Sequence, residues 1–140
     1  MSLAVVLTIF VVATAAVGLL REIAIKEPYW RREVVEAKVK VLFPNYAPAH
    51  ILQLLDTVVP SFWGPERLQL ALLKLSKGDV EQLRRYVGTP KRDFMNLIGR
   101  AEYPKASRIG MLNCAELPGF VQGLINDSDL RQYLTWLKKR

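Results

Sequence analysis

The sequence predicts an all-α protein in which one N-terminal transmembrane helix is followed by a small multi-helix bundle. The first observation is an uncharged apolar run from Ser2 to Leu20, which Arg21 ends. The second is the recurrence of apolar residues three and four positions apart in most later segments. The third is the prolines and glycines between these segments, where helices begin and end. The expected parts are a transmembrane anchor, an amphipathic juxtamembrane segment and a soluble helical domain, at residues 1–25, 26–43 and 44–140.

The apolar run has the length of a membrane span. A helix rises about 1.5 Å per residue and the hydrocarbon core is about 30 Å thick, so residues 2–20 just cross it. A cleaved signal peptide is an alternative, with small residues at Ala13, Ala15 and Ala16, but no Lys or Arg precedes the run. A buried helix of a soluble protein is a second alternative, although such helices rarely contain so long an uninterrupted run. We expect a span, and leave open whether the segment is ever cleaved.

The charges that follow the run predict its orientation. No charged side chain precedes it, whereas the next segment carries Arg21, Lys26, Arg31, Arg32, Lys38 and Lys40. The positive-inside rule then places the N-terminus outside and the C-terminal domain in the cytoplasm, at the cell inner membrane. Tyr29 and Trp30 suit the aromatic belt of the inner interface. The single cysteine, Cys114, agrees with a reducing compartment.

Residues 29–43 are compatible with a helix or a strand. Helical spacing joins Trp30, Val34, Ala37 and Val41, and strand alternation joins Ala37, Val39, Val41 and Phe43. We favour an amphipathic helix because Glu36 and Lys40 would form an i,i+4 pair and no later segment offers a partner strand. Pro44 ends the segment.

The remaining chain predicts a series of short helices, at residues 48–59, 65–76, 79–87, 90–102, 118–125 and 128–139. Pro48, Pro65 and Pro90 suit the first turn of a helix, where the missing N–H costs nothing. Asp79 is expected to cap the helix that follows it, as is Asp127 or Ser128. Residues 104–118 are the least regular part of the chain.

The helix at 65–76 is expected to be central, and the last helix to be oriented by its charges. Leucines cover nearly all sides of the first of these, at Leu68, Leu70, Leu72, Leu73 and Leu75. A helix that is apolar this far round has neighbours on two faces. In the last helix, Asp129 lies at the positive end of the dipole and Lys138, Lys139 and Arg140 at its negative end.

One stretch resembles a known group of proteins. It reads ERLQLALLKLSKGD from Glu66, then RDF at 92–94 and AEYP at 101–104. It is similar to an uncharacterised family of small all-helical bacterial proteins with a leucine-rich helix, a Gly-Asp step, an Arg-Asp-aromatic step and Ala-Glu-Tyr-Pro. Phe94 stands where that family would have tyrosine. The resemblance covers about residues 66–104 and implies a bacterial helical domain with no known activity.

The sequence contains no recognisable catalytic parts, so we expect a protein that is not an enzyme. Phosphate-binding loops, dinucleotide fingerprints, nucleophile elbows and metalloprotease motifs are all absent. His50 and Cys114 are the only histidine and cysteine, which excludes a conventional zinc site. Asp93 and Glu102 lie about two and a half turns apart on one helix, too far for an acid–base pair. We therefore expect no catalytic, cofactor-binding or metal-binding residues and no cofactor.

Several residues are candidates for partner binding. They are Phe62 and Trp63 on a connector, Trp136 off the inward face of the last helix, and Arg92, Asp93, Glu102 and Tyr103 around the AEYP step. The latter four would form an exposed recognition corner, or Glu102 and Tyr103 would simply end a helix with the tyrosine ring packed on the core. Phe62 and Trp63 would bind a partner, dip into the interface or plug the end of the bundle.

The leading hypothesis is a membrane-anchored helical interaction or adaptor domain that positions a partner at the cytoplasmic membrane face. Its partners would be the lipid bilayer, through residues 2–20, and a protein of unknown identity. The alternative is a binder of anionic lipid headgroups or nucleic acid through its basic surface, since the net charge is +7. Nucleic acid is disfavoured because the basic residues are spread along the chain.

Overall fold

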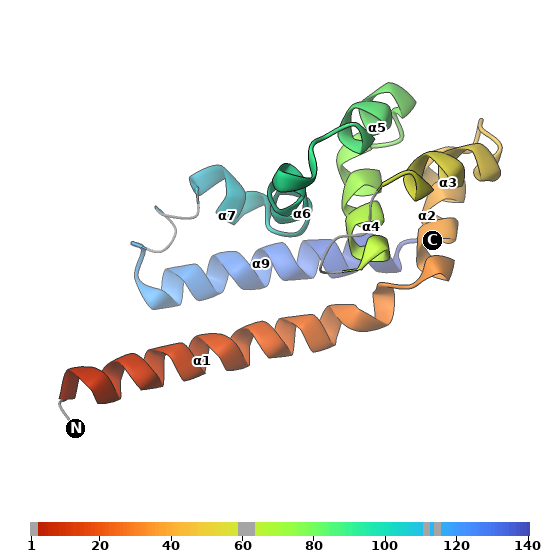
Figure 1. Cartoon of the computed structure of the whole chain (residues 1–140). Helices are drawn as coiled ribbons and strands as arrows, with labels where there is room; N and C mark the ends of the chain where they lie inside the picture. Colours follow the sequence, from red (N-terminus) through yellow and green to blue (C-terminus); the bar gives the residue numbers. More distant parts are fainter. Residues whose placement is uncertain (1–2, 59–63, 111–112, 114–115) are drawn as a thin grey trace.

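A computed structural model of the chain describes residues 3–58, 64–110, 113 and 116–140 (Figure 1). All regular secondary structure in these ranges is helical. The all-α prediction is therefore confirmed for the described part of the chain. The helices are α1 (Leu3–Lys26), α2 (Arg32–Leu42), α3 (Pro48–Asp56), α4 (Pro65–Ser76), α5 (Val80–Val87), α6 (Phe94–Glu102), α7 (Pro104–Ile109) and α9 (Gly119–Lys138), with short 3₁₀ helices η1 (Glu27–Tyr29) and η2 (Lys91–Asp93).

The prediction of a membrane-spanning helix is wrong. Among the helices of the described residues, none combines the length and the apolar character that crossing a membrane requires. The apolar run belongs to α1, which continues past Arg21 to Lys26, and the Lys26 side chain is buried against the rest of the protein. Three predictions that depended on the span are therefore also wrong: the single-pass topology, the inner-membrane localisation and the N-out orientation.

Helix α4 is the centre of the body, as its leucines predicted. It packs against α6, α5 and α2, and Leu68, Leu70, Ala71, Leu72 and Leu73 have no exposed surface. Pro65 starts this helix and Pro48 starts α3, as expected. The predicted cap of α5 is also present, because the Asp79 carboxylate accepts hydrogen bonds from the N–H groups of Glu81 and Gln82.

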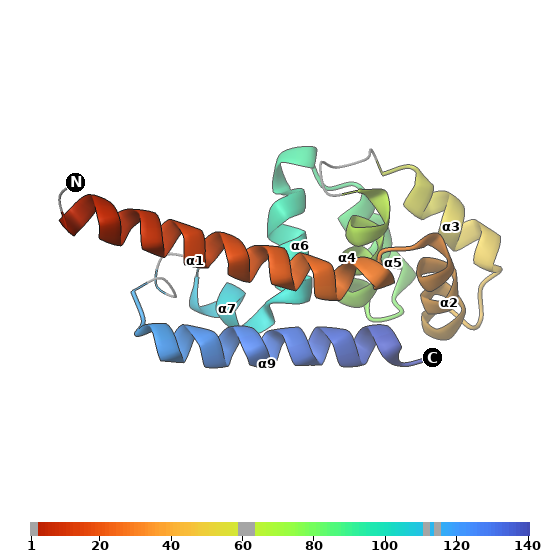
Figure 2. The same ribbon diagram turned by 90° about the horizontal axis from the view of Figure 1, so that it is seen from below.

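Helices α1 and α9 are the two long elements of the fold. Both views show the N-terminal part of α1 extending beyond the body, while its other end reaches α2 (Figures 1 and 2). Helix α9 packs on α6 and α7 and begins at the same end of the molecule as α1 (Figures 1 and 2).

The segment at residues 29–43 contains helix α2, as favoured, but the face that this helix buries was predicted wrongly. The buried residues of α2 are Val35, Lys38 and Val39, whereas Val41 is exposed. Lys38 lies on this face together with the apolar Val35 and Val39. Its ammonium donates to the backbone carbonyls of Trp136 and Lys139 at the C-terminal end of α9, where the helix dipole is negative. Burial, followed by the charge of Lys139, lowers the pKa of the Lys38 ammonium.

The C-terminal region also differs from the prediction. The two helices expected at 118–125 and 128–139 form the single helix α9, so neither Asp127 nor Ser128 caps a helix start. Asp129 is buried on α9, where its carboxylate accepts the backbone N–H groups of Lys105 and Ala106 at 3.1 and 3.0 Å. It thereby caps α7, a helix in the region expected to be least regular. The helix expected at 90–102 begins as η2 and continues as α6.

We predict that Gly78→Ala strongly destabilises the fold. Gly78 has a φ of +82°, and a Cβ there would lie 2.7 Å from the Leu42 carbonyl oxygen. The strained backbone and the clash should cost about 2 kcal/mol or more in the free energy of unfolding. Gly99→Ala is the matched control: a Cβ at this position in α6 meets nothing within 4 Å, so alanine should stabilise by about 0.5–1 kcal/mol. Urea unfolding measures both, and equal shifts would contradict the prediction.

Candidate functional site: the ion cluster around Glu102

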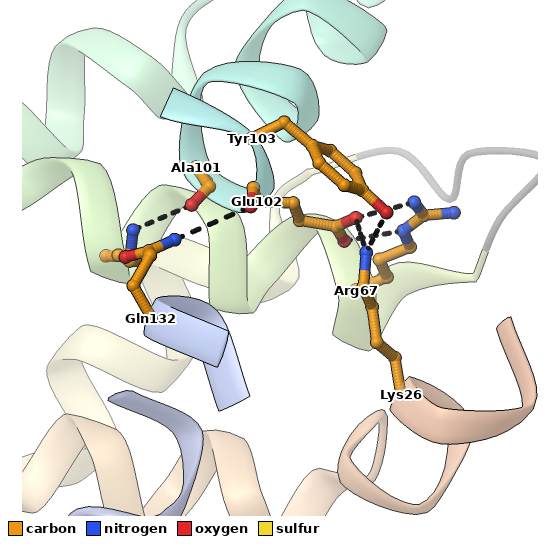
Figure 3. Close-up of polar contacts among 7 residues, drawn as sticks. Lys26, Arg67, Ala101, Glu102, Tyr103 and Gln132 are labelled. Atoms are coloured by element: carbon orange, nitrogen blue, oxygen red, sulfur yellow. Dashed lines mark hydrogen bonds and ion pairs between the residues drawn. The ribbon is translucent and has the colours of Figure 1, made fainter. Parts of the chain in front are cut away.

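A fully buried carboxylate, that of Glu102, lies at the centre of the site (Figure 3). Arg67 donates from Nε to Oε1 and from Nη2 to Oε2, each at 2.8 Å. Lys26 Nζ donates to Oε2, also at 2.8 Å. One carboxylate thus accepts a two-pronged arginine contact and an ammonium contact, which are strong charge-assisted geometries.

The cluster connects parts of the chain that are far apart in sequence. Lys26 is the last residue of α1, Arg67 lies in the first turn of α4, and Glu102 is the last residue of α6. Aromatic rings surround the cations. The Lys26 Nζ donates to the Tyr103 hydroxyl at 2.6 Å and lies 4.2 Å from the centre of that ring. The Arg67 guanidinium lies 4.6 Å from the Trp30 ring centre.

The surroundings of Glu102 keep it ionised. Burial by itself would raise the pKa of the carboxyl, but the hydrogen bonds from Arg67 and the charges of Lys26 and Arg67 outweigh burial and hold the pKa below its ordinary value. A carboxylate that is ionised, shielded from water and occupied at both oxygens is unsuited to proton transfer with a substrate. Its chemistry is therefore that of a structural ion cluster, which fixes the end of α1 to α4 and α6.

Two further groups complete the surroundings of the cluster. Gln132 of α9 donates to the Glu102 backbone carbonyl at 3.5 Å, and Lys74 of α4 donates to the carbonyl of Ala101 at 2.7 Å (Figure 3).

Tyr133 is completely buried nearby, and its hydroxyl has no hydrogen-bond partner among the described residues. Burial, and then the charge of Glu102, raises the pKa of the Tyr133 hydroxyl well above its ordinary value.

The residues expected to form one recognition corner lie in different surroundings. Arg92 and Asp93 are exposed in η2, with side chains 84% and 51% accessible. Glu102 is completely buried and Tyr103 is half-buried at the other end of α6. The four residues therefore do not form a single exposed corner. Their role in partner binding stays a prediction.

The other candidates are also placed by the structure, with two exceptions. Trp136 is half-buried and stacks on Tyr133, with ring centres 5.8 Å apart and planes 18° apart. His50 is exposed at the start of α3. Phe62 and Trp63 lie outside the described residues. Within the described residues, no group of three or more His, Cys, Asp or Glu side chains is arranged to hold a metal ion.

The sequence alone does not single out Lys26 and Arg67 as members of a site. Lys26 follows an apolar run, where a lysine is ordinarily an interfacial charge. The position of Arg67 could have indicated a buried charge, because this arginine lies within a helix that is apolar on nearly all sides. An arginine at such a position needs a buried partner. The sequence does not say which carboxylate supplies it.

The fold and this cluster define an all-helical protein in which a long apolar helix is fixed to a compact body by buried charges. No protein-family profile, curated protein or solved structure matches the chain. The resemblance of residues 66–104 to a bacterial family therefore stays a prediction.

We predict that Glu102→Gln lowers the free energy of unfolding by about 3–5 kcal/mol, because it leaves two cations buried without their anion. Glu81→Gln, which removes an exposed carboxylate paired with Arg84, should change it little. Chemical denaturation at neutral pH measures both. A Glu102→Gln protein as stable as wild type would contradict the role of the cluster.

The same cluster predicts a pH dependence. The pKa of Glu102 is lower in the folded protein than its ordinary value of 4.5. The stabilisation is therefore fully present above pH 4.5 and is lost as the pH falls through the folded-state pKa. The stability difference between wild type and Glu102→Gln should shrink on acidification, as urea unfolding at several pH values will measure. A difference that is constant with pH would contradict this linkage.

Tyr133→Phe should leave the fold intact and stabilise it by up to about 1 kcal/mol, because it removes a buried hydroxyl that lacks a partner while keeping the ring. The stacking on Trp136 and the packing of the ring are unchanged by this substitution. Thermal and urea unfolding test it. A loss of 1 kcal/mol or more would instead show that the hydroxyl forms a stabilising hydrogen bond.

Proposed function

We propose that this chain is a helical protein-interaction domain, which presents α1 to a partner protein in a fixed orientation. The observation that carries the proposal is a row of exposed apolar side chains on α1. Their exposed fractions lie between 45% and 65%, and the residues are Val5, Val6, Ile9, Val12, Val17 and Leu20. Contiguous exposed apolar surface of this kind is characteristic of interaction sites.

The spacing of these residues on α1 supports a partner that packs against α1 through a helix or between helices. At 100° per residue they fall within an arc of about 140°. This is the width of the stripe that a helix buries against another element. Ala13 and Ala16 are exposed within the same arc, and small residues there permit close approach of a second helix. From Val5 to Leu20 the stripe extends about 22 Å. The partner surface that fits it is an uncharged apolar helix, or a groove between helices.

The ion cluster supports the fixed orientation. Lys26 ends α1 and is 1% exposed, bonded to Glu102. A helix held at one end by buried charges keeps its stripe at a set angle to the body. Such preorganisation lowers the ordering cost of binding, and it sets the position of a bound partner relative to the rest of the domain.

The beginning of α9 carries a second pair of exposed apolar side chains. Phe120 and Leu124 are 73% and 67% exposed, and they lie one turn apart on a helix. Since α9 begins at the end of the molecule where α1 projects (Figure 2), the two helices together present apolar side chains at that end. Aromatic residues such as Phe120 are enriched in protein interfaces relative to the rest of the surface.

Site-specific photo-crosslinking in cells that express the full chain tests this proposal. We expect p-benzoylphenylalanine at position 12 to give a discrete adduct with one protein, and the same group at the exposed position 81 to give none. Val5→Asp with Val17→Asp should abolish the adduct, because two carboxylates in the stripe oppose burial. Circular dichroism confirms that the body stays helical.

The mass of the adduct identifies the occupant as a second copy or as a different protein with an apolar helix. Identical adducts from positions 12 and 81, or an adduct that survives the double aspartate variant, would overturn the role of the stripe. The absence of any adduct at position 12 would do the same.

A further inference from the structure

A cavity of about 850 Å³ lies at the junction of four helices, on a part of the body that the ion cluster does not occupy. The end of α4, one face of α5, one face of α6 and the short helix α7 form its walls. Its volume is within the range of small-molecule sites, which is about 300–1,000 Å³. The charged and aromatic side chains that line it are Lys74, Lys77, Asp79, Tyr86, Arg100 and Arg108.

The charge of this cavity is strongly unbalanced. Four basic side chains line it and only one acidic side chain does. The Asp79 carboxylate is already engaged as the cap of α5, where it accepts two backbone N–H groups. Among the described residues, Lys77, Arg100 and Arg108 form no ion pair. The cavity therefore carries an excess of positive charge, which the Asp79 carboxylate offsets only in part.

Two of the lining groups are held in place. Lys74 Nζ donates to the Ala101 carbonyl at 2.7 Å, and the Arg100 guanidinium lies 5.9 Å from the centre of the Tyr86 ring. These contacts order the cavity wall before any ligand binds, which lowers the cost of binding. The Tyr86 ring, with Leu75 and Pro104, gives the cavity an apolar side.

The backbone at Lys77 supports a role for its side chain. Lys77 has a φ of +52°, and it is the one non-glycine residue in the described chain with a positive φ. Glycine is the residue that this position at the end of a helix prefers. A lysine here keeps a less favourable backbone conformation, which is characteristic of functional positions. Its ammonium belongs to the set that lines the cavity.

We propose that this cavity binds a small molecule that carries two or more phosphate groups, with Lys77, Arg100 and Arg108 contacting the phosphate oxygens. Arginine and lysine are the usual partners of phosphate oxygens in proteins. Tyr86 and Leu75 contact the organic part of the ligand. The cations line one hollow of small-molecule size, which favours a small ligand over nucleic acid, whose binding usually needs basic residues clustered along a face. The site thus differs from binding by the diffuse basic surface that the sequence suggested.

Isothermal titration calorimetry with inorganic pyrophosphate and with ATP tests the proposal on the full chain. We expect Lys77→Ala with Arg108→Ala to weaken the binding of both probes at least tenfold, since each lost charge-assisted contact removes binding energy. The matched control is Lys40→Ala with Arg131→Ala, which removes the same charge at exposed positions away from the cavity. The control should bind as wild type does.

A second variant separates binding from folding. Lys77→Gly removes the ammonium and supplies the residue that the left-handed backbone prefers. It should keep or raise the melting temperature while it weakens pyrophosphate binding. Unchanged pyrophosphate affinity in Lys77→Gly would overturn the proposal, as would equal weakening in the matched control.

Vesicles that contain phosphatidic acid distinguish the source of the phosphate. The small-molecule assignment predicts that the cavity variants lose ATP binding and keep any residual vesicle binding. Vesicle binding that depends on Lys77 and Arg108 without measurable ATP or pyrophosphate binding at millimolar concentration would overturn it in favour of a lipid headgroup.

Discussion

The contact on which the arrangement of the helices depends is that between the Glu102 carboxylate and the two cations Lys26 and Arg67. Removing three charges from water costs several kcal/mol per ion, and mutual attraction repays this only when geometry and hydrogen bonds are nearly complete. That condition is met here, because both carboxylate oxygens are occupied at 2.8 Å. The condition holds only when the ends of α1, α4 and α6 meet at one point. The cluster therefore specifies where α1 leaves the body.

The same physical device fixes α9. Lys38 of α2 donates to carbonyls at the C-terminal end of α9, and Asp129 of α9 accepts the N–H groups at the start of α7. The ends of a helix leave backbone groups without partners, and in these two places a side chain from another helix supplies them. The apolar core around α4 provides much of the buried surface, and these polar contacts decide how the outer helices sit on it.

This division of roles bears on both proposals. The apolar stripe of α1 is useful for recognition only if its angle to the body is set, and Lys26 sets it. The basic cavity lies on another part of the body, yet Lys74 connects the two regions. This lysine lines the cavity and donates to the carbonyl of Ala101, the residue before Glu102. Changes at the cluster are therefore expected to reach the cavity through α6, whereas changes at the exposed Arg108 should not disturb the cluster.

The sequence by itself determined the helices of the body from α2 to α6, the proline starts of α3 and α4, the Asp79 cap and the central place of α4. Each depends on residues within a few positions of one another. Of the site, it singled out Glu102 and Tyr103, either in an exposed corner or at a helix end with the tyrosine ring on the core, and it missed Lys26 and Arg67. The tertiary structure alone decided which face of α2 is buried, that α9 is one continuous helix, and that the C-terminal end of α1 is buried against the body. The physical reason is that a charge is buried only beside its partner, and these partners lie 23 to 101 residues away.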